Sequence, residues 1–291
     1  MIDFASTPIA ALATAENGIG WADMQTYVTV MIALVIVMTI ADLIHKGSAT
    51  YFFQAAAKAE AQLAAGDAES SIGKEDGRLK QVTAGDKVNA LVGTVVVDVA
   101  TAGEFSDPGR RLVHIITMWG FVLFAASTAM IIYGEAETAM LATAWNVGAI
   151  MLLVGSWWFW FAYKVDCMSE AQSLLQIDFR KDIFSLGLMG SSLAALGWAY
   201  TGGGTGGWFN FVIIATLALF GSVYWSKFSH MFFKPAAAYN KRIIKANGTN
   251  ENLPHETRDD VWQQNRHSME LLKDAPMEMG DGIKRFGRKN Y

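Results

Sequence analysis

Charged residues are scarce in this 291-residue chain. They make up 17% of it, whereas hydrophobic residues make up 52%; soluble globular domains carry about 25% charged residues. The charges are also clustered, which leaves long stretches that carry none, as in a chain of which part lies in hydrocarbon. The net charge of −4 includes no basic excess, and no nucleic-acid-binding motif is present. Binding of DNA or RNA is therefore not expected.

Cysteine occurs once, at Cys167, which excludes a disulfide within the chain. An iron–sulfur cluster usually needs about four thiolates, so the chain alone cannot hold one. Residues 1–26 contain no lysine or arginine, and a signal peptide with a charged n-region is therefore not expected. The sequence also has no nucleophile–base constellation, phosphate-binding loop or zinc-ligand spacing, and the catalytic residues, if there are any, stay unknown.

Long apolar segments are the main feature that is present. Each is close to the about 20 residues that cross a bilayer core, and tyrosine or tryptophan lies at the segment ends, as at membrane interfaces. Lipid offers the backbone no hydrogen-bond partner, so helices are expected. We therefore predict an all-α membrane protein with a bundle of five transmembrane helices, at residues 27–44, 112–133, 141–163, 183–200 and 208–226.

The cations predict the orientation of this bundle. All 23 lysines and arginines lie between the first two spans, between the third and fourth, or after the fifth, and the N-terminal segment and the turns at 134–140 and 201–207 have none. Cytoplasmic loops carry the positive charge, so the N-terminus is expected outside and the C-terminus in the cytoplasm. The expected parts are a periplasmic segment 1–26, a first transmembrane helix 27–46, a cytoplasmic segment 47–111 with an interfacial helix, a four-helix membrane bundle 112–228 and a cytoplasmic tail 229–291.

Most residues outside the membrane are thus expected in the cytoplasm. Residues 55–65 are alanine-rich and predict a helix, residues 66–86 are polar and expected to be mobile, and residues 88–102 are apolar but too short to span. The last stretch suits an in-plane helix, a re-entrant helix or a cap over the bundle. The polar tail from residue 247 suits either a disordered tail or a segment that folds on a partner.

Ionisable residues are absent from the middle of the spans. Proton-coupled transporters and ion pumps usually keep such residues there. No pair of glycine- or proline-interrupted half-helices recurs either, as it does in many secondary transporters. A small transporter or channel is therefore the least favoured class.

Histidine is the residue type that suggests chemistry. All five histidines lie on the expected cytoplasmic side, and His45, His114 and His230 lie at span ends. Two imidazoles from different helices at matching depth are what a six-coordinate haem b requires, and His114 and His230 suit this role best. Arg111 and Lys227 are near enough in the sequence to meet the haem propionates. The alternative is that these histidines simply lie among lipid headgroups.

A quinone site has weaker support. Asp42 and His45 lie three residues apart on one helix face and would exchange protons with a quinone, unless they are only a solvated helix end. Trp119, near the start of the second span, is a further quinone candidate. The aromatic run at residues 156–163 fits an interfacial belt better than a quinone platform.

Three stretches within residues 85–245 resemble a known family. They are Val97-Asp98 through Arg110-Arg111-Leu112-Val113-His114 to Trp119-Gly120-Phe121, then Arg180-Lys181-Asp182-Ile183-Phe184, then Lys227-Phe228-Ser229-His230 through Pro235. Together these stretches resemble the cytochrome b membrane subunit of respiratory nitrate reductase, the gamma subunit. The same family includes membrane subunits of heterodisulfide reductase and of quinone-interacting complexes of sulfur metabolism.

The resemblance implies a function and a cofactor. The family stacks two haems across the membrane, and His114 and His230 correspond to the pair nearest the cytoplasm. The positions of the other pair hold Phe124 and Val212, which cannot bind iron, so at most one haem b is expected. Among subfamilies, the chain is most similar to the membrane anchor found with adenylylsulfate reductase in sulfur-oxidising bacteria. That similarity implies a soluble cytoplasmic iron–sulfur flavoenzyme as partner, quinone as substrate and the bacterial cytoplasmic membrane as location.

Two functional hypotheses remain open beside the transporter. The first is a membrane subunit of a redox complex, itself non-catalytic or quinone-interacting, that links a soluble oxidoreductase to membrane quinone. The second is a structural membrane anchor that holds no cofactor. The sequence does not name the partner or the direction of electron flow.

Overall fold

The computed structural model describes residues 3–16, 18–47, 80–103, 107–164, 175–226 and 230–248, with the single residues Gln54, Ala57, Ala61, Phe105 and Ser173. Over this described part the regular structure is entirely helical. It divides into two compact units. One, called the bundle below, comprises the described part of Met1–Lys46 and Phe105–Met231. The other, the α5–α10 unit, comprises the described part of Gly47–Glu104 and Phe232–Arg288.

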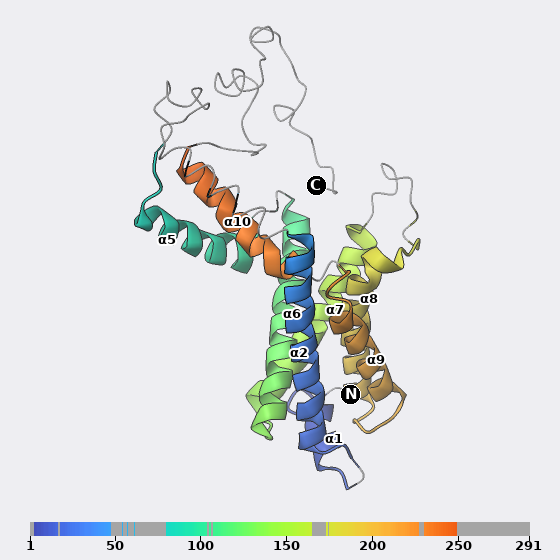
Figure 1. Ribbon diagram of the computed structural model, residues 1–291. Helices are drawn as coiled ribbons and strands as arrows, with labels where there is room; N and C mark the ends of the chain where they lie inside the picture. The colour runs from blue at the N-terminus through green and yellow to red at the C-terminus, as the bar shows by residue number, and fades with distance from the viewer. Residues whose placement is uncertain are drawn as a thin grey trace. The chain divides into compact units, whose positions relative to one another are not determined.

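Four helices of the bundle are long and apolar enough to cross a membrane (Figure 1). Their length and composition indicate a multi-pass membrane protein, which confirms the predicted class. They begin or end a few residues away from the predicted spans, because capping and interfacial residues extend the helices. The four are α2 (Trp21–Lys46), α6 (Pro108–Gly134), α7 (Ala139–Ala162) and α8 (Phe179–Tyr200).

The fifth predicted span forms a shorter helix, α9 (Gly207–Gly221), of 15 residues. Such a helix is about 22 Å long, less than the about 30 Å of a hydrocarbon core. Beyond it the backbone turns, and the N–H of Ser226 donates to the carbonyl of Ser222 at 2.8 Å. Val223 in this turn is fully buried. The fifth span therefore stays a prediction, made of α9 and the buried turn that follows it.

Local signals in the sequence set the ends of α6 and α7. Asp107 caps α6, because its carboxylate accepts the N–H of Arg110 at 2.8 Å, and Pro108 fits the first helical turn. Glu135 ends the same helix in the left-handed conformation, with φ 49°. Thr138 then caps α7 by accepting the N–H of Leu141 at 3.3 Å. These caps make the turn between α6 and α7 short and fix the two helices as antiparallel neighbours.

Glycines bring α6 and α7 into backbone contact. A Cβ on Gly120 would lie 2.6 Å from the backbone nitrogen of Leu152, and one on Gly148 would lie 2.5 Å from that of Phe124. A Cβ on Gly155 would lie 2.4 Å from the hydroxyl of Thr117. In lipid, where the hydrophobic effect does not drive helices together, close packing of small residues is a main source of association. Close packing of the two backbones therefore stabilises the α6–α7 pair along its length.

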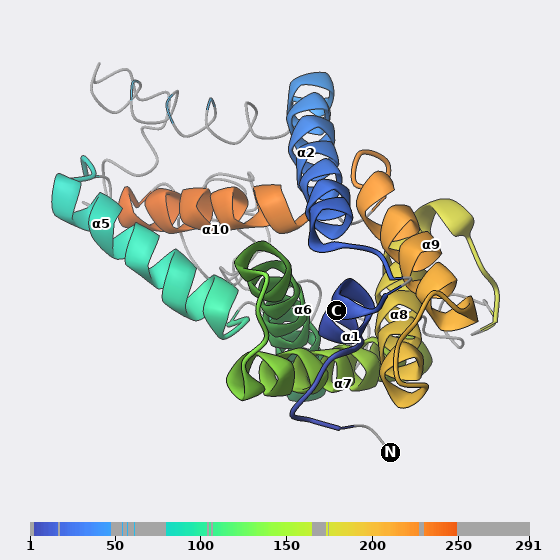
Figure 2. The same ribbon diagram turned by 90° about the horizontal axis from the view of Figure 1, so that it is seen from below.

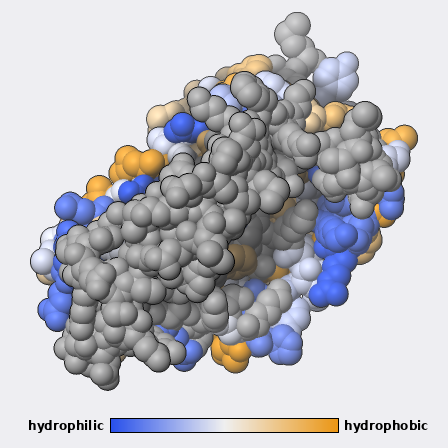
Figure 3. Space-filling model, turned by 90° about the horizontal axis from the view of Figure 1, so that it is seen from above, coloured by the Kyte–Doolittle hydropathy of each residue, from blue (hydrophilic) through white to orange (hydrophobic). Residues whose placement is uncertain are grey.

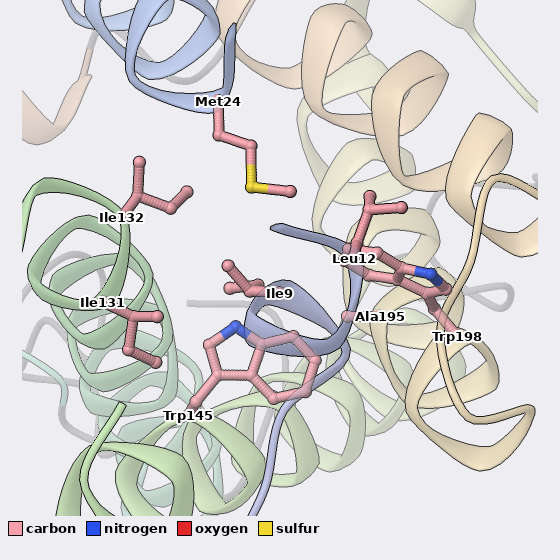
Figure 4. Close-up of a cluster of buried hydrophobic side chains, with 8 residues drawn as sticks. All are labelled: Ile9, Leu12, Met24, Ile131, Ile132, Trp145, Ala195 and Trp198. Carbon is pink, nitrogen blue, oxygen red and sulfur yellow. The ribbon is translucent and has the colours of Figure 1, made fainter. Parts of the chain in front are cut away.

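A short helix that the sequence analysis did not predict, α1 (Pro8–Thr14), lies among the ends of the longer helices (Figure 2). Ile9 and Leu12 of α1 point into a buried apolar cluster (Figure 4). The other members come from α2, α6, α7 and α8: Met24, Ile131, Ile132, Trp145, Ala195 and Trp198. The cluster shows that α1 is part of the core of the bundle.

Hydrogen bonds hold α1 in this place. The N–H of Thr7 donates to both carboxylate oxygens of Glu137, at 3.0 and 3.1 Å, and the Thr7 hydroxyl contacts the same carboxylate. The side-chain amide of Asn146 donates to the carbonyl of Ser6 at 3.1 Å. A helix of seven residues is too short to be stable alone. Tertiary contacts therefore stabilise it.

The two ends of the bundle differ in charge. The end at which α2 terminates and α6 begins is called the His114 end, and the opposite end, which contains α1, the α1 end. Among the described residues, the His114 end carries the cations Arg110, Arg111, Lys164, Arg180 and Lys181, together with the carboxylates Asp42, Asp107, Asp178 and Asp182. The α1 end carries the carboxylates Asp3, Glu16, Asp23, Glu135 and Glu137 and no lysine or arginine.

The α5–α10 unit contains α5 (Ala84–Gly93), the π-helical turn η1 (Thr94–Ala100) and most of α10 (His230–Ala246). Arg242 of α10 donates to both carboxylate oxygens of Asp98, at 2.6 and 2.9 Å. A Cβ on Gly93 would lie 2.6 Å from the same guanidinium. This bidentate pair joins η1 to α10, and α10 is the second helix that the sequence analysis did not predict.

A capping box starts α5. The Asp86 carboxylate accepts from the Thr83 N–H and hydroxyl, and the Thr83 hydroxyl accepts the Asp86 N–H. The backbone hydrogen bond from Thr83, followed by its hydroxyl, lowers the pKa of Asp86 below its ordinary 3.8. The cap therefore stabilises α5 above that pH, and its contribution is lost as the pH falls through the lowered pKa.

The structure corrects two expectations for this region. The helix predicted at 88–102 is present but begins at Ala84, so residues 84–86 belong to its first turn and are not a mobile polar segment. In the predicted helix 55–65, Ala57 and Ala61 are helical, and the other positions lie outside the described residues. The tail beyond Gly248 also lies outside them.

The α6–α7 contact gives a first testable prediction. Gly120→Ala should lower the stability of the bundle by about 1–3 kcal/mol, because the new methyl group meets the α7 backbone and cannot be accommodated without a shift. Gly134→Ala is the matched control, since a Cβ there meets nothing within 4 Å. Thermal unfolding in detergent, followed by circular dichroism, measures both. If both variants unfold at the same midpoint temperature, α6 and α7 do not approach each other at Gly120 as closely as the structure shows.

Candidate functional site

The candidate site begins with His114, in the second turn of α6. Its side chain is half-buried, and its ring centroid lies 4.9 Å from that of Phe105, with the planes tilted by 44°. His114 and Phe121 are seven residues apart, so they lie on nearly the same face of α6. Gly120 and Thr117 lie in the contact with α7, and His114 and Phe121 lie about 60° and 40° around the helix from Thr117, at the edge of that contact.

This face of α6 points toward α9. The rings of Phe121 and Phe220 lie 6.4 Å apart between centroids. Both pack against a buried cluster made of Leu152, Leu188, Leu219 and Val223, and Met231 packs against the same cluster. Met231 directly follows His230 in the chain. The residue that follows His230 therefore packs against the same cluster as Phe121.

The side chain of His230 lies outside the described residues, as does Lys227. Arg111, in the first turn of α6, is half-buried at the His114 end, beside the half-buried Arg110. The structure thus places Arg111 one turn from His114. The described part of the site thus has one imidazole, that of His114, with two arginines within one turn of it; an imidazole ligand and cations for the carboxylates are among the groups that a haem b would need.

The quinone candidates are not equivalent in the structure. Asp42 is buried, with 3% of its surface exposed, whereas His45 is exposed and its ring lies 6.0 Å from that of Tyr224. A buried carboxyl group in a transmembrane helix is by default a functional candidate. Trp119 lies five residues from His114, about 140° around the helix, and is 40% exposed. It therefore lies on a different face of α6 from His114.

At the α1 end, Phe124 and Val212 both pack against the apolar cluster that contains α1. The Phe124 ring lies 5.2 Å from that of Trp145 between centroids. Around these two positions the bundle is filled by side chains of α1, α7 and α8. The α1 end is therefore a packed apolar core around Phe124 and Val212. These are the positions that correspond to the second histidine pair of the cytochrome b family that the sequence resembles.

The sequence analysis missed a buried ion pair at the His114 end. The Lys164 ammonium lies 2.8 Å from the Asp182 carboxylate, and both side chains are only 8% exposed. The same ammonium donates to the carbonyl of Gln176 at 2.9 Å and lies 3.6 Å from the centroid of the Trp160 ring. The N–H of Asp178 donates to the Asp182 carboxylate at 3.0 Å. The pair ties the end of α7 to the start of α8.

The sequence contains a signal for this ion pair, which the sequence analysis did not recognise. Lys164 served only as a cation for the orientation, and Asp182 only as part of a family motif. A lysine just after one apolar span and an aspartate in the first turn of the next one predict such a pair. Side-chain pairing across the intervening loop is the feature that hydropathy alone does not reveal.

Among the described residues, no group of three or more histidine, cysteine, aspartate or glutamate side chains is able to hold a metal ion. A haem with two histidine ligands does not require such a group. Comparisons with protein-family models, with curated proteins and with solved structures find no match. The fold therefore defines the class, an all-helical multi-pass membrane protein, and the site must support its own interpretation.

The ion pair gives a second prediction. Lys164→Met should destabilise the bundle by about 3–5 kcal/mol, because it leaves the Asp182 charge buried without its cation. Lys181→Met is the matched control: Lys181 and Asp178 form an exposed pair at 3.0 Å, and its loss should leave stability close to wild type. Thermal unfolding in detergent compares them. If both variants melt alike, the Lys164–Asp182 pair does not hold α7 to α8.

Proposed function

We propose that the chain is the membrane subunit of a redox complex, linking a soluble cytoplasmic oxidoreductase to membrane quinone through at most one haem b. The partner proposed from the sequence resemblance is an iron–sulfur flavoenzyme, with adenylylsulfate reductase as the best candidate. The second candidate function is a structural anchor without a cofactor.

One observation supports the redox subunit most. His114 lies on the α6 face that Phe121 shares, and this face and Met231, next to His230, meet at one buried cluster. Two segments that flank the histidines and are far apart in the sequence therefore contact one buried cluster. A purely structural anchor has no need for this convergence.

The proposed ligands are His114 and His230, with Arg111 and Lys227 near the propionates. When bound, a haem b would supply one-electron redox chemistry. The two histidines would hold the porphyrin, and Arg111 and Lys227 would neutralise its carboxylates at the His114 end. Asp42 is the proposed group for proton exchange with quinone, because it is a buried carboxyl at the same end, and His45 and Trp119 are secondary candidates.

The filled α1 end supports a limit of one haem. Phe124 and Val212 offer no ligand, and a porphyrin between them would displace the cluster that contains α1 and Trp145. Loss of such a core costs several kcal/mol, since each large buried side chain contributes about 3–5 kcal/mol.

The proposed topology has five spans, with α9 and the buried turn after it as the fifth, in the bacterial cytoplasmic membrane. The N-terminus lies outside and the C-terminus inside. The difference between the two ends of the bundle supports this orientation, because the His114 end carries the cations and the α1 end carries carboxylates. Residues 47–111 and the tail 229–291 then lie in the cytoplasm, where a soluble partner has access to them.

The topology gives a third prediction. Reporter fusions at Glu137 and Gly204 should show a periplasmic location, and fusions at Gly73 and Asn250 a cytoplasmic one, because all lysines and arginines lie in the proposed inner segments. Paired alkaline phosphatase and fluorescent-protein fusions measure the two sides. A cytoplasmic result at Gly204 would rule out the fifth span.

The haem ligands give a fourth prediction. His114→Ala and His230→Ala should each abolish a b-type absorption spectrum of the purified chain, because a six-coordinate haem b needs both imidazoles. His267→Ala, in the tail, is the control and should leave the spectrum unchanged. A spectrum that survives both of the first two substitutions excludes this ligand pair. No spectrum even from the wild-type chain would favour the structural anchor.

A further inference from the structure

An exposed apolar stripe runs along α5 and η1. Five side chains, each 52% to 58% exposed, are spaced as one face of an amphipathic helix: Val88, Leu91, Val92, Val95 and Val96. Exposed hydrophobic residues also lie among hydrophilic ones on the described part of the face in Figure 3. Single exposed apolar residues are ordinary, but five in one stripe indicate a surface that contacts something apolar.

The opposite face of the same segment packs on α10, which lies beside α5 (Figure 1, Figure 2). Ala90 and Thr94 are buried, Gly93 lies against the Arg242 guanidinium, and Asp98 accepts two hydrogen bonds from that guanidinium. The contact with α10 therefore fixes the rotation of the segment and leaves the apolar stripe facing outward.

The tail beyond Gly248 lies outside the described residues, but its sequence contains the signals of an amphipathic helix at residues 258–275. Thr257 and Asp260 have the spacing of the capping box that starts α5. Pro276 directly follows the segment, and a proline there is a helix stop signal. The sequence therefore predicts a helix of about five turns in the tail.

The predicted tail helix has an apolar stripe of its own. Val261, Trp262, Met269 and Leu272 fall within about 100° of one another around a helix, and the opposite side is mostly charged or amide residues. A helix over residues 258–275 is about 27 Å long, and α5 with η1 is about 25 Å long. The two stripes therefore match in length.

The tail leaves the described structure next to the start of α5. The N–H of Lys80 donates to the carbonyl of Asn247 at 3.1 Å. Nine residues, 249–257, precede the predicted helix and reach at most about 30 Å, which is enough to bring it to the stripe that begins at Val88. A segment joined to its docking surface by so short a linker has an effective concentration in the millimolar range. This favours the tail over a separate molecule as the occupant of the stripe.

We propose that residues 258–275 form an amphipathic helix that docks on the stripe from Val88 to Val96. The tail helix contributes Val261, Trp262, Met269 and Leu272, and α5 and η1 contribute the face that α10 leaves open. Docking removes from water an apolar surface that otherwise promotes association between copies of the chain. This inference does not depend on haem, quinone or a soluble partner.

The test is a cross-link between pairs of cysteines in the full chain. Cys167→Ser removes the only cysteine. Val92→Cys then lies in the middle of the stripe, and Asn265→Cys in the middle of the tail stripe. Gln263→Cys in place of Asn265→Cys is the matched control, because it lies two residues away, about 160° around the same predicted helix.

Each chain is reconstituted in phosphatidylcholine nanodiscs and treated with a short bismaleimide, whose reach suits the about 8–10 Å between the axes of packed helices. Mass spectrometry of the digested monomer band identifies the cross-linked peptides. The expected yield within one chain is roughly fivefold higher for the 92–265 pair than for the 92–263 pair, because only the first pair lies in the contact. Trp262→Asp with Leu272→Asp should lower it to the control value.

Equal yields for the two pairs overturn the proposal. Products that form only between chains also overturn it, because a second copy then occupies the stripe. A second measurement follows the rate at which a water-soluble maleimide labels Val92→Cys, which should rise roughly fivefold with Trp262→Asp and Leu272→Asp, since a covered thiol reacts only from the open state. A thiol that is slow to react and indifferent to these substitutions overturns the proposal, because lipid or another protein then covers the stripe.

Discussion

The backbone contact between α6 and α7 is the constraint on which the rest of the bundle depends. Gly120, Gly148 and Gly155 commit one face of each helix to the other, with no space for a side chain between them. His114 and Phe121 lie at the edge of this contact, and Phe121 packs toward Phe220 of α9 and the cluster around Leu219. A larger residue at any of these glycines would rotate or separate the helices, and the position of His114 would change with them.

The bundle separates two kinds of environment along its length. At the α1 end, a seven-residue helix fills the space among the longer helices and is fixed by Glu137 and Asn146. At the His114 end, polar groups gather, with a buried carboxyl at Asp42 and the ion pair of Lys164 and Asp182. Buried charge is costly in lipid, and among the described residues of the bundle it lies at this end, which is why the proposed redox centre is placed there.

Hydropathy alone predicted α2, α6, α7 and α8, because a helix that crosses lipid needs about 20 mostly apolar residues in a row. It failed for α1 and α10, whose stability comes from particular contacts. Thr7 followed by Pro8 is a signal for the start of a helix. The seven residues of α1 are too few to show the 3.6-residue hydrophobic periodicity of a helix. Pro235 within α10 argues against a helix by local rules, and packing of the unit overrides it.

The candidate site was predictable only in part. The sequence placed His114 and His230 at span ends, but the face that His114 occupies depends on the glycine contacts between α6 and α7. Asp42 and His45 were expected to act together from their spacing, yet one is buried and the other exposed. The Lys164–Asp182 pair joins the end of α7 to the start of α8, and hydropathy alone does not reveal it.

The central claim is that one end of this bundle holds a single redox centre. A pyridine hemochrome assay on the purified full-length chain, with protein quantified by amino-acid analysis, tests it most directly. The account predicts one b-type haem per chain, with the low-spin spectrum of two histidine ligands. Two haems per chain would contradict the packed α1 end, and a chain that binds none would contradict the redox function.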